Sequence, residues 1–129
     1  MIRREDGNYV VLEDNLRVPS GVSYMLSYRD AVKRAFPNHY RAARVRMVES
    51  FPDDHLSMLK SLASEYQPDP IVVVLTPGVF NTAYFEHALL AQLMGTPLVE
   101  RRDLAVYDNV VICLHFGLKA CGCDLSACR

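Results

Sequence analysis

The sequence predicts an α/β fold with a short, mostly parallel sheet flanked by helices. Residues 71–75 form an uninterrupted, largely β-branched run, which is typical of a strand buried on both faces. A helical segment follows up to Met94, Gly95 is placed to end it, and Leu98-Val99 supplies a second short strand. Because β–α–β crossovers are right-handed and pack on parallel sheets, these two strands are expected to lie parallel in one sheet.

Composition and charge limit the kind of protein this chain can be. The 129 residues are one domain's worth of chain, 50% are hydrophobic and 22% are charged. The net charge of −1 gives no reason to expect nucleic acid or an anionic membrane as a partner. No apolar run approaches the ~18 residues of a transmembrane helix, and residues 1–5 lack the apolar segment of a signal peptide. A cytoplasmic location is therefore expected.

Other elements are predicted along the chain. A hairpin-like start leads into a strand from Tyr9, and an amphipathic helix is expected from Val22 to Phe36, ended by Pro37. Residues 38–43 are expected to be loop and residues 44–48 a short strand. A further helix should begin at Pro52, and residues 104–111 should form a last strand with a kink or tight turn at residues 108–109.

The stretch LEDNLRVPSG, residues 12–21, carries a candidate metal and phosphate site. In a strand, Glu13, Asn15 and Arg17 would project to the same side. A carboxylate and an amide oxygen suit Mg²⁺, and an arginine adds a planar fork for phosphate. Residues 19–21 (Pro-Ser-Gly) would leave backbone N–H groups free nearby. The alternative is that these side chains form the solvated face of an antiparallel sheet.

A second candidate site follows the run at residues 71–75. Ligands of parallel sheets bind beyond the carboxyl ends of the strands, here residues 76–81. Gly78 permits close backbone approach, Asn81 or Thr82 can cap the next helix, and Glu86 comes in its first turns. The alternative is a capped, buried helix whose His87 is a satisfied core group.

Two long strings in this order, VLEDNLRVPSGVSYML and LTPGVFNTAYFEHALLAQLMGTPLVERRDL, resemble the circularly permuted ATP-grasp family (type 2). That family is distantly akin to glutathionylspermidine synthase-like carboxylate–amine ligases. The resemblance covers about residues 2–111, and the family's proteins are much longer, so the chain resembles an internal fragment of one. The resemblance divides the chain into a metal- and phosphate-binding region (1–48), a β–α–β substrate-side region (49–111) and a tail that does not resemble the family (112–129).

The resemblance implies ATP- and Mg²⁺-dependent joining of a small-molecule carboxylate to an amine through an acyl phosphate. It implies one role for each group of candidate residues. Glu13 and Asn15 would bind the metal, and Arg17 would be catalytic. Ser20 and Gly21 would bind phosphate, and Gly78, Asn81 and Glu86 would bind the substrate. Relatives carry an aspartate just before the position of Met1 that such metal sites use. The chain by itself is therefore expected to be inactive, and exposed apolar surface is expected to favour self-association.

The tail after Val111 departs from the family. All four cysteines lie there, at positions 113, 121, 123 and 128, and with His115 they could hold zinc, although Cys-x-Cys is tighter than usual zinc spacing. Residues 112–129 can instead be back-translated into codons and read again one base later. One such back-translation then encodes YVCTSGLKRVDVIYRRV, which is close to the family's VYxxTxxGLKRVDVIYRR. This agreement favours a shifted reading frame, with irregular structure in the tail.

Two other interpretations of the protein stay open. One is a small non-enzymatic module with a cysteine-rich metal- or partner-binding tail, and the other is a ligase half that works with a separately encoded remainder.

Overall fold

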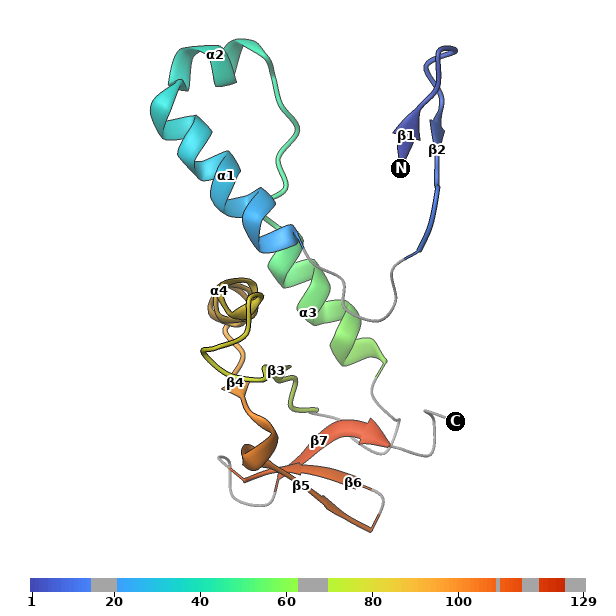
Figure 1. Cartoon of the computed structure of the whole chain (residues 1–129), viewed down its shortest axis with the longest axis vertical. Helices are drawn as coiled ribbons and strands as arrows, with labels where there is room; N and C mark the ends of the chain where they lie inside the picture. The colour runs from blue at the N-terminus through green and yellow to red at the C-terminus, as the bar shows by residue number, and fades with distance from the viewer. Residues whose placement is uncertain (15–20, 63–69, 109, 115–118, 125–129) are drawn as a thin grey trace.

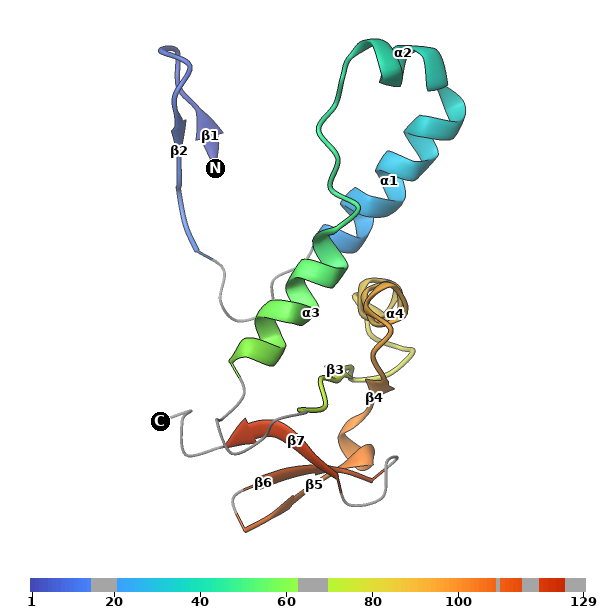
Figure 2. The same cartoon turned by 180° about the vertical axis from the view of Figure 1, so that it is seen from behind.

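The computed structural model describes residues 1–14, 21–62, 70–108 and 110–114, and the backbone of residues 119–124. Along the long axis of the molecule, helices α1 and α2 lie at one end, α3 and α4 in the middle, and the strands from β3 onward at the other end (Figures 1 and 2). The N-terminal hairpin stands beside the helical end. It pairs β1 (Ile2–Arg3) with β2 (Tyr9–Val10) in antiparallel register, which confirms the hairpin-like start.

Three of the four α-helices in the described part of the chain were predicted from the sequence. They are α1 (Val22–Ala35), α3 (Phe51–Ser61) and α4 (Tyr84–Met94). Gly95 ends α4 in a left-handed conformation with φ of 65°, as the glycine position indicated. Helix α4 contacts both α1 and α3, and the rings of Tyr24 and Phe85 lie 5.2 Å apart between α1 and α4.

The fourth helix, α2 (Pro37–Ala42), corrects the expectation of a loop over residues 38–43. Pro37 is predicted to end the preceding helix, and α1 does end before it, but proline is also favoured in the first turn of a helix. The strand expected at residues 44–48 is not formed, and Arg44 adopts a positive φ of 46° there instead.

The sheets confirm the α/β class and correct one detail of it. Strands β3 (Val74–Leu75) and β4 (Leu98–Val99) are parallel, as predicted. Between β4 and the final sheet lies a short 3₁₀ helix, η1 (Arg101–Asp103). The remaining described pairings, β1–β2 and the order β5–β6–β7, are antiparallel, so the described sheets are not mostly parallel.

The three-stranded sheet extends into the segment expected to be irregular. It consists of β5 (Leu104–Tyr107), β6 (Val110–Cys113) and β7 (Lys119–Asp124). The turn between β5 and β6 contains Asp108 with φ of 49°, which confirms the predicted tight turn. Because β6 runs to Cys113 and pairs with β7, residues 112–113 and 119–124 form strands.

The core among the described residues is small. Its buried hydrophobic residues are Ala91, Met94, Val99 and Cys113. Val99 and Cys113 pack together, with Val73, Leu104 and Val111 around them. The run at residues 71–75 is only partly buried and Leu75 is 55% exposed, so the prediction of a strand buried on both faces was wrong. No described helix is long and apolar enough to cross a membrane.

Candidate functional site

The turn after β3 is held by the side chain of Thr76. This residue is only 2% exposed, and its backbone N–H donates to the Val99 carbonyl at 2.8 Å, which extends the β3–β4 pairing by one residue. The hydroxyl Oγ1 of Thr76 accepts the backbone N–H of Gly78 at 3.2 Å and lies 3.0 Å from Nδ1 of His87 on α4. Thr76 therefore joins the strand end, the following turn and the helix.

Asn81 orders the entry into α4 without being its N-cap. Its Oδ1 accepts the backbone N–H of Ala83 at 2.9 Å, and its carbonyl accepts that of Tyr84 at 3.0 Å. Ala83 occupies the N-cap position, so the expectation that Asn81 or Thr82 would cap the helix was wrong by one or two residues. Among the described residues, the side-chain amide nitrogen of Asn81 makes no hydrogen bond, so it can still donate to a ligand.

Gly78 lies directly beside the carboxylate of Glu100, which follows β4. Gly78 is buried and has a φ of 108°, and a Cβ built on it would lie 3.4 Å from Oε1 of Glu100. Glu100 and Asp103 form a reciprocal capping box around η1, in which the Glu100 N–H donates to Oδ2 of Asp103 at 2.7 Å. Both strand ends thus contribute to one polar edge, as expected for a parallel pair.

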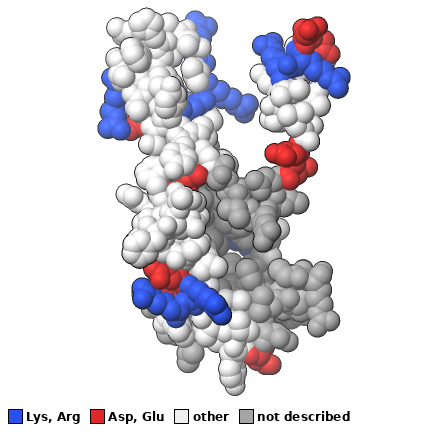
Figure 3. Space-filling view, viewed as in Figure 1, with Lys and Arg blue, Asp and Glu red and all other residues white. Residues whose placement is uncertain are grey.

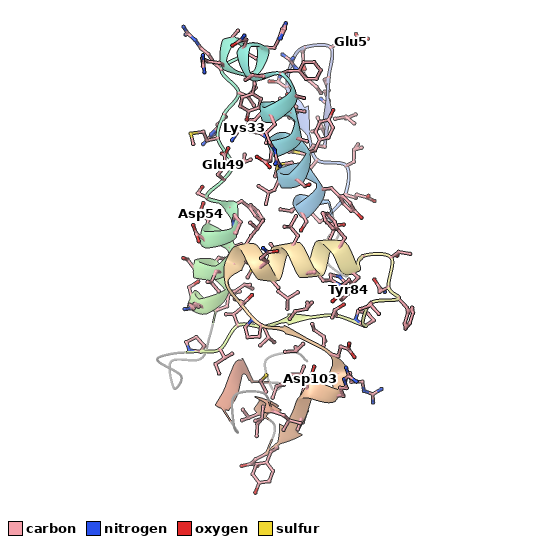
Figure 4. The ribbon with its side chains drawn as sticks, turned by 90° about the vertical axis from the view of Figure 1, so that its left-hand side faces the viewer. Glu5, Lys33, Glu49, Asp54, Tyr84 and Asp103 are labelled. Carbon is pink, nitrogen blue, oxygen red and sulfur yellow. The ribbon has the colours of Figure 1, made fainter. Side chains whose placement is uncertain are left out.

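A cavity of about 420 Å³ opens at this edge, lined by Thr76, Pro77, Glu100, Arg101 and Arg102. Nε of Arg102 lies 3.4 Å from Oε2 of Glu100, and the two side chains are 79% and 37% exposed. Blue arginine atoms and red carboxylate atoms meet on this face at the lower left of Figure 3. Asp103, the capping-box partner of Glu100, is labelled in Figure 4. The predictions for ligand binding here named Gly78 and Asn81 but missed Glu100, because only the β3–β4 register brings Glu100 to Gly78. They also missed the two arginines that follow Glu100 and line the cavity.

Glu86 points to a different place from the other predicted substrate residues. Its carboxylate accepts the backbone N–H of Gly21, and its carbonyl accepts the hydroxyl of Ser23 at 2.9 Å. Gly21 has a φ of 106° at the start of α1, and Ser23 is 1% exposed. The structure therefore brings together Glu86 and the predicted phosphate-binding residue Gly21. Their proposed roles stay predictions.

The predicted metal ligands are only partly described. Glu13 is exposed and lies beyond β2, which ends at Val10, so it does not stand on a strand as expected. Asn15, Arg17 and Ser20 lie outside the described residues. Within the described part of the chain no group of three or more His, Cys, Asp or Glu side chains could hold a metal ion. The oxygen donors of Glu13 and Asn15 fit Mg²⁺ by their chemistry.

A second cavity, of about 460 Å³, lies where α1, α4 and the segment that leads into α3 meet. Its apolar wall includes Leu26, Leu89 and Leu93, and a salt bridge between Lys33 and Glu49 lies at its edge (Figure 4). Sequence patterns gave no signal for this cavity, because its residues come from three separate segments.

The described helices and sheets define an α/β protein with a polar edge at the ends of β3 and β4. A family model described as a circularly permuted ATP-grasp matches residues 1–120, and the chain belongs to that family. This confirms the resemblance. The description of the model names no type within the family, so the finer assignment to type 2 stays a prediction.

The relatives are much longer proteins. An uncharacterised protein of Mycobacterium leprae is 53% identical over 111 residues, which are 86% of this chain and 20% of that protein. An uncharacterised protein of a Synechocystis species is 50% identical over 84% of this chain and 23% of its own length. A Frankia casuarinae protein, provisionally named a glutamate–cysteine ligase, is 39% identical over 97% of this chain and 15% of its own length. The chain thus spans about a fifth of the length of the first of these relatives.

Proposed function

We propose that this chain corresponds to part of an ATP- and Mg²⁺-dependent ligase that joins a carboxylate to an amine through an acyl phosphate. Membership of the circularly permuted ATP-grasp family over residues 1–120 is the observation that carries the proposal. The polar edge at Thr76, Gly78 and Glu100 supports it, because parallel sheets bind ligands at that edge. The provisional name of the Frankia casuarinae relative suggests glutamate as a first carboxylate to test.

In this proposal each candidate side chain has a limited task. Glu13 and Asn15 hold Mg²⁺, which neutralises charge on the phosphates of ATP. Arg17 stabilises the negative charge that builds up when the substrate carboxylate oxygen attacks the terminal phosphorus and ADP leaves. The amine nitrogen then attacks the acyl carbon and phosphate leaves, while Gly78 and Asn81 position the substrates. The isolated chain is inactive in this proposal because a catalytic site needs its whole set of ligands held in place.

Trapping with hydroxylamine tests the proposed intermediate, since acyl phosphates react with it to give hydroxamates. Residues 1–111 would replace the matched segment of the Mycobacterium leprae relative, and hydroxamate would be measured with ATP, Mg²⁺ and glutamate or a mixture of other carboxylates. We expect ATP-dependent hydroxamate from this hybrid protein and none from the 129-residue chain alone.

A hybrid that carries Glu13→Gln and a hybrid that carries Glu5→Gln form the matched pair. Both residues are exposed carboxylates near the hairpin, but only Glu13 belongs to the proposed metal site. Loss of hydroxamate with Glu13→Gln alone supports the proposal. Equal hydroxamate from the two variants contradicts the metal role of Glu13, and a folded hybrid that yields none with any carboxylate contradicts the acyl phosphate route.

A further inference from the structure

The turn between β3 and α4 presents apolar side chains to solvent. Phe80 is fully exposed and its neighbour Val79 is 62% exposed. Asn81 orders the turn behind them through its hydrogen bonds to the backbone of Ala83 and Tyr84. An aromatic ring buries a large apolar area when it enters a pocket, and such residues often dominate the energy of an interface. Phe80 therefore has the properties of an anchor for a partner.

The cavity where α1, α4 and the segment that leads into α3 meet has the size and the lining to receive an apolar anchor. Its volume of about 460 Å³ lies in the range of pockets that hold small molecules. Leu26, Leu89 and Leu93 supply an apolar wall, and Leu93 is 44% exposed, so a partner can reach that wall from solvent. Because Phe80 is fully exposed, its ring does not occupy this cavity in its own chain.

The charged side chains that line this cavity are already engaged within the chain. Lys33 forms a salt bridge with Glu49, and both are labelled in Figure 4. Arg34 forms a salt bridge with Asp30, and Arg29 donates to a backbone carbonyl. A charged partner would have to compete with these interactions, whereas a neutral apolar partner leaves them intact. The cavity therefore fits an uncharged anchor better than an ion.

We propose that this cavity in one copy of the chain receives Phe80 from a second copy. Residues 76–83, which carry Phe80, contain no charged side chain, so their approach leaves the ion pairs of the cavity intact. The contact joins two different surfaces of the same protein, so each copy can both provide and receive an anchor. A single anchor makes a small interface, and we expect weak association with a dissociation constant on the order of 1 mM. The contact involves neither ATP nor Mg²⁺ and does not rest on the proposed ligase function.

Variants of the full chain that each remove one half of the contact test this proposal. Phe80→Ser removes the anchor and keeps the cavity. Leu93→Lys places a charge on the cavity wall near the end of α4, where a helix favours a cation, and keeps the anchor. Ser27→Phe fills the cavity from an exposed position on α1 and provides a second cavity variant. Sedimentation equilibrium should show self-association weakened about tenfold or more in all three, whereas Leu62→Lys, at an exposed leucine outside the cavity, should associate like the unmodified chain.

Mixing two of these variants restores one complete contact. Unlabelled Leu93→Lys, which keeps Phe80, is added to isotope-labelled Phe80→Ser, which keeps the cavity, and amide signals are followed by NMR. We expect saturable shifts at the cavity residues of α1 and α4, and none when unlabelled Phe80→Ser is added instead. The proposal is overturned if the unmodified chain is a monomer at every concentration, if both cavity variants associate as strongly as Leu62→Lys, or if the mixture leaves the cavity signals unchanged.

Discussion

The backbone N–H of Gly21 donates to the carboxylate of Glu86, which joins positions 65 residues apart in the chain. The hydroxyl of Ser23 adds a second hydrogen bond to the Glu86 carbonyl at 2.9 Å. Together with the packing of Tyr24 on Phe85, these contacts hold the start of α1 against the first turn of α4. The proposed phosphate-binding segment and the β3–α4 unit are thereby parts of one assembly.

Glu86→Ala should lower the free energy of unfolding by about 1 kcal/mol, because the Gly21 N–H loses a charged acceptor in a partly exposed setting. Glu86→Gln should lose less, since its side-chain oxygen can still accept. Urea unfolding followed by circular dichroism measures both variants, with Glu5→Ala as the control for an exposed glutamate. If Glu86→Ala unfolds at the same urea concentration as the control, the contact does not stabilise the fold.

Gly78→Ala should destabilise the protein more than Gly95→Ala. Both glycines have positive φ, but Gly95 at 65° lies in the left-handed region that other residues sometimes adopt, and nothing lies within 4 Å of its added Cβ. Gly78 at 108° lies outside that region, and its added Cβ would also meet Glu100 at 3.4 Å. We expect a loss of about 1 kcal/mol for Gly95→Ala and roughly 2 kcal/mol or more for Gly78→Ala. The melting temperature of Gly78→Ala should therefore be lower than that of Gly95→Ala. A lower melting temperature for Gly95→Ala would contradict the special backbone requirement at Gly78.

We also expect the isolated chain to self-associate through apolar side chains that the described structure leaves exposed. Phe80 is fully exposed in the turn before α4, and its neighbour Val79 is 62% exposed. Phe80→Ser should therefore reduce association measured by sedimentation velocity over a range of protein concentrations, with little change in stability. Thr82→Ser is the control in the same turn. Unchanged association of Phe80→Ser would place the contact surface elsewhere.

Local patterns predicted the elements that depend on neighbouring residues. Helical spacing gave α1, α3 and α4, and Gly95 marked the end of α4. The β–α–β order gave the parallel β3–β4 pair and placed Gly78 and Asn81 at its carboxyl edge.

Features that depend on distant residues could not be predicted in this way. The Gly21–Glu86 contact and the approach of Glu100 to Gly78 follow from tertiary packing and sheet register, which no local pattern contains. Pro37 was ambiguous, because a proline suits both the end of one helix and the first turn of the next. The β-branched run at residues 71–75 predicted burial, but burial depends on neighbours, and among the described strands β3 pairs only with β4.

The reading-frame hypothesis for residues 112–129 predicts a specific error in the coding sequence. In the shifted frame, position 113 becomes valine, which would suit the apolar cluster in which Cys113 is fully buried beside Val99. Re-sequencing the gene from upstream of Met1 through the codons after Val111 should reveal one base surplus or missing near Ile112. If the DNA confirms the tail as written and the purified protein contains stoichiometric zinc, the zinc-binding alternative is supported and the frameshift is excluded.

The most direct test of the proposed metal site is paramagnetic broadening by Mn²⁺, which takes the same oxygen ligands as Mg²⁺. Mn²⁺ and ATP would be added to the full chain and to the Glu13→Gln and Glu5→Gln variants, and amide signals followed by NMR. We predict that signals at Glu13 and Gly21 broaden first in the unmodified chain and in Glu5→Gln, and that Glu13→Gln abolishes this preference. Broadening that is unchanged by Glu13→Gln, or that centres on other carboxylates such as Asp53, would contradict a metal site at Glu13.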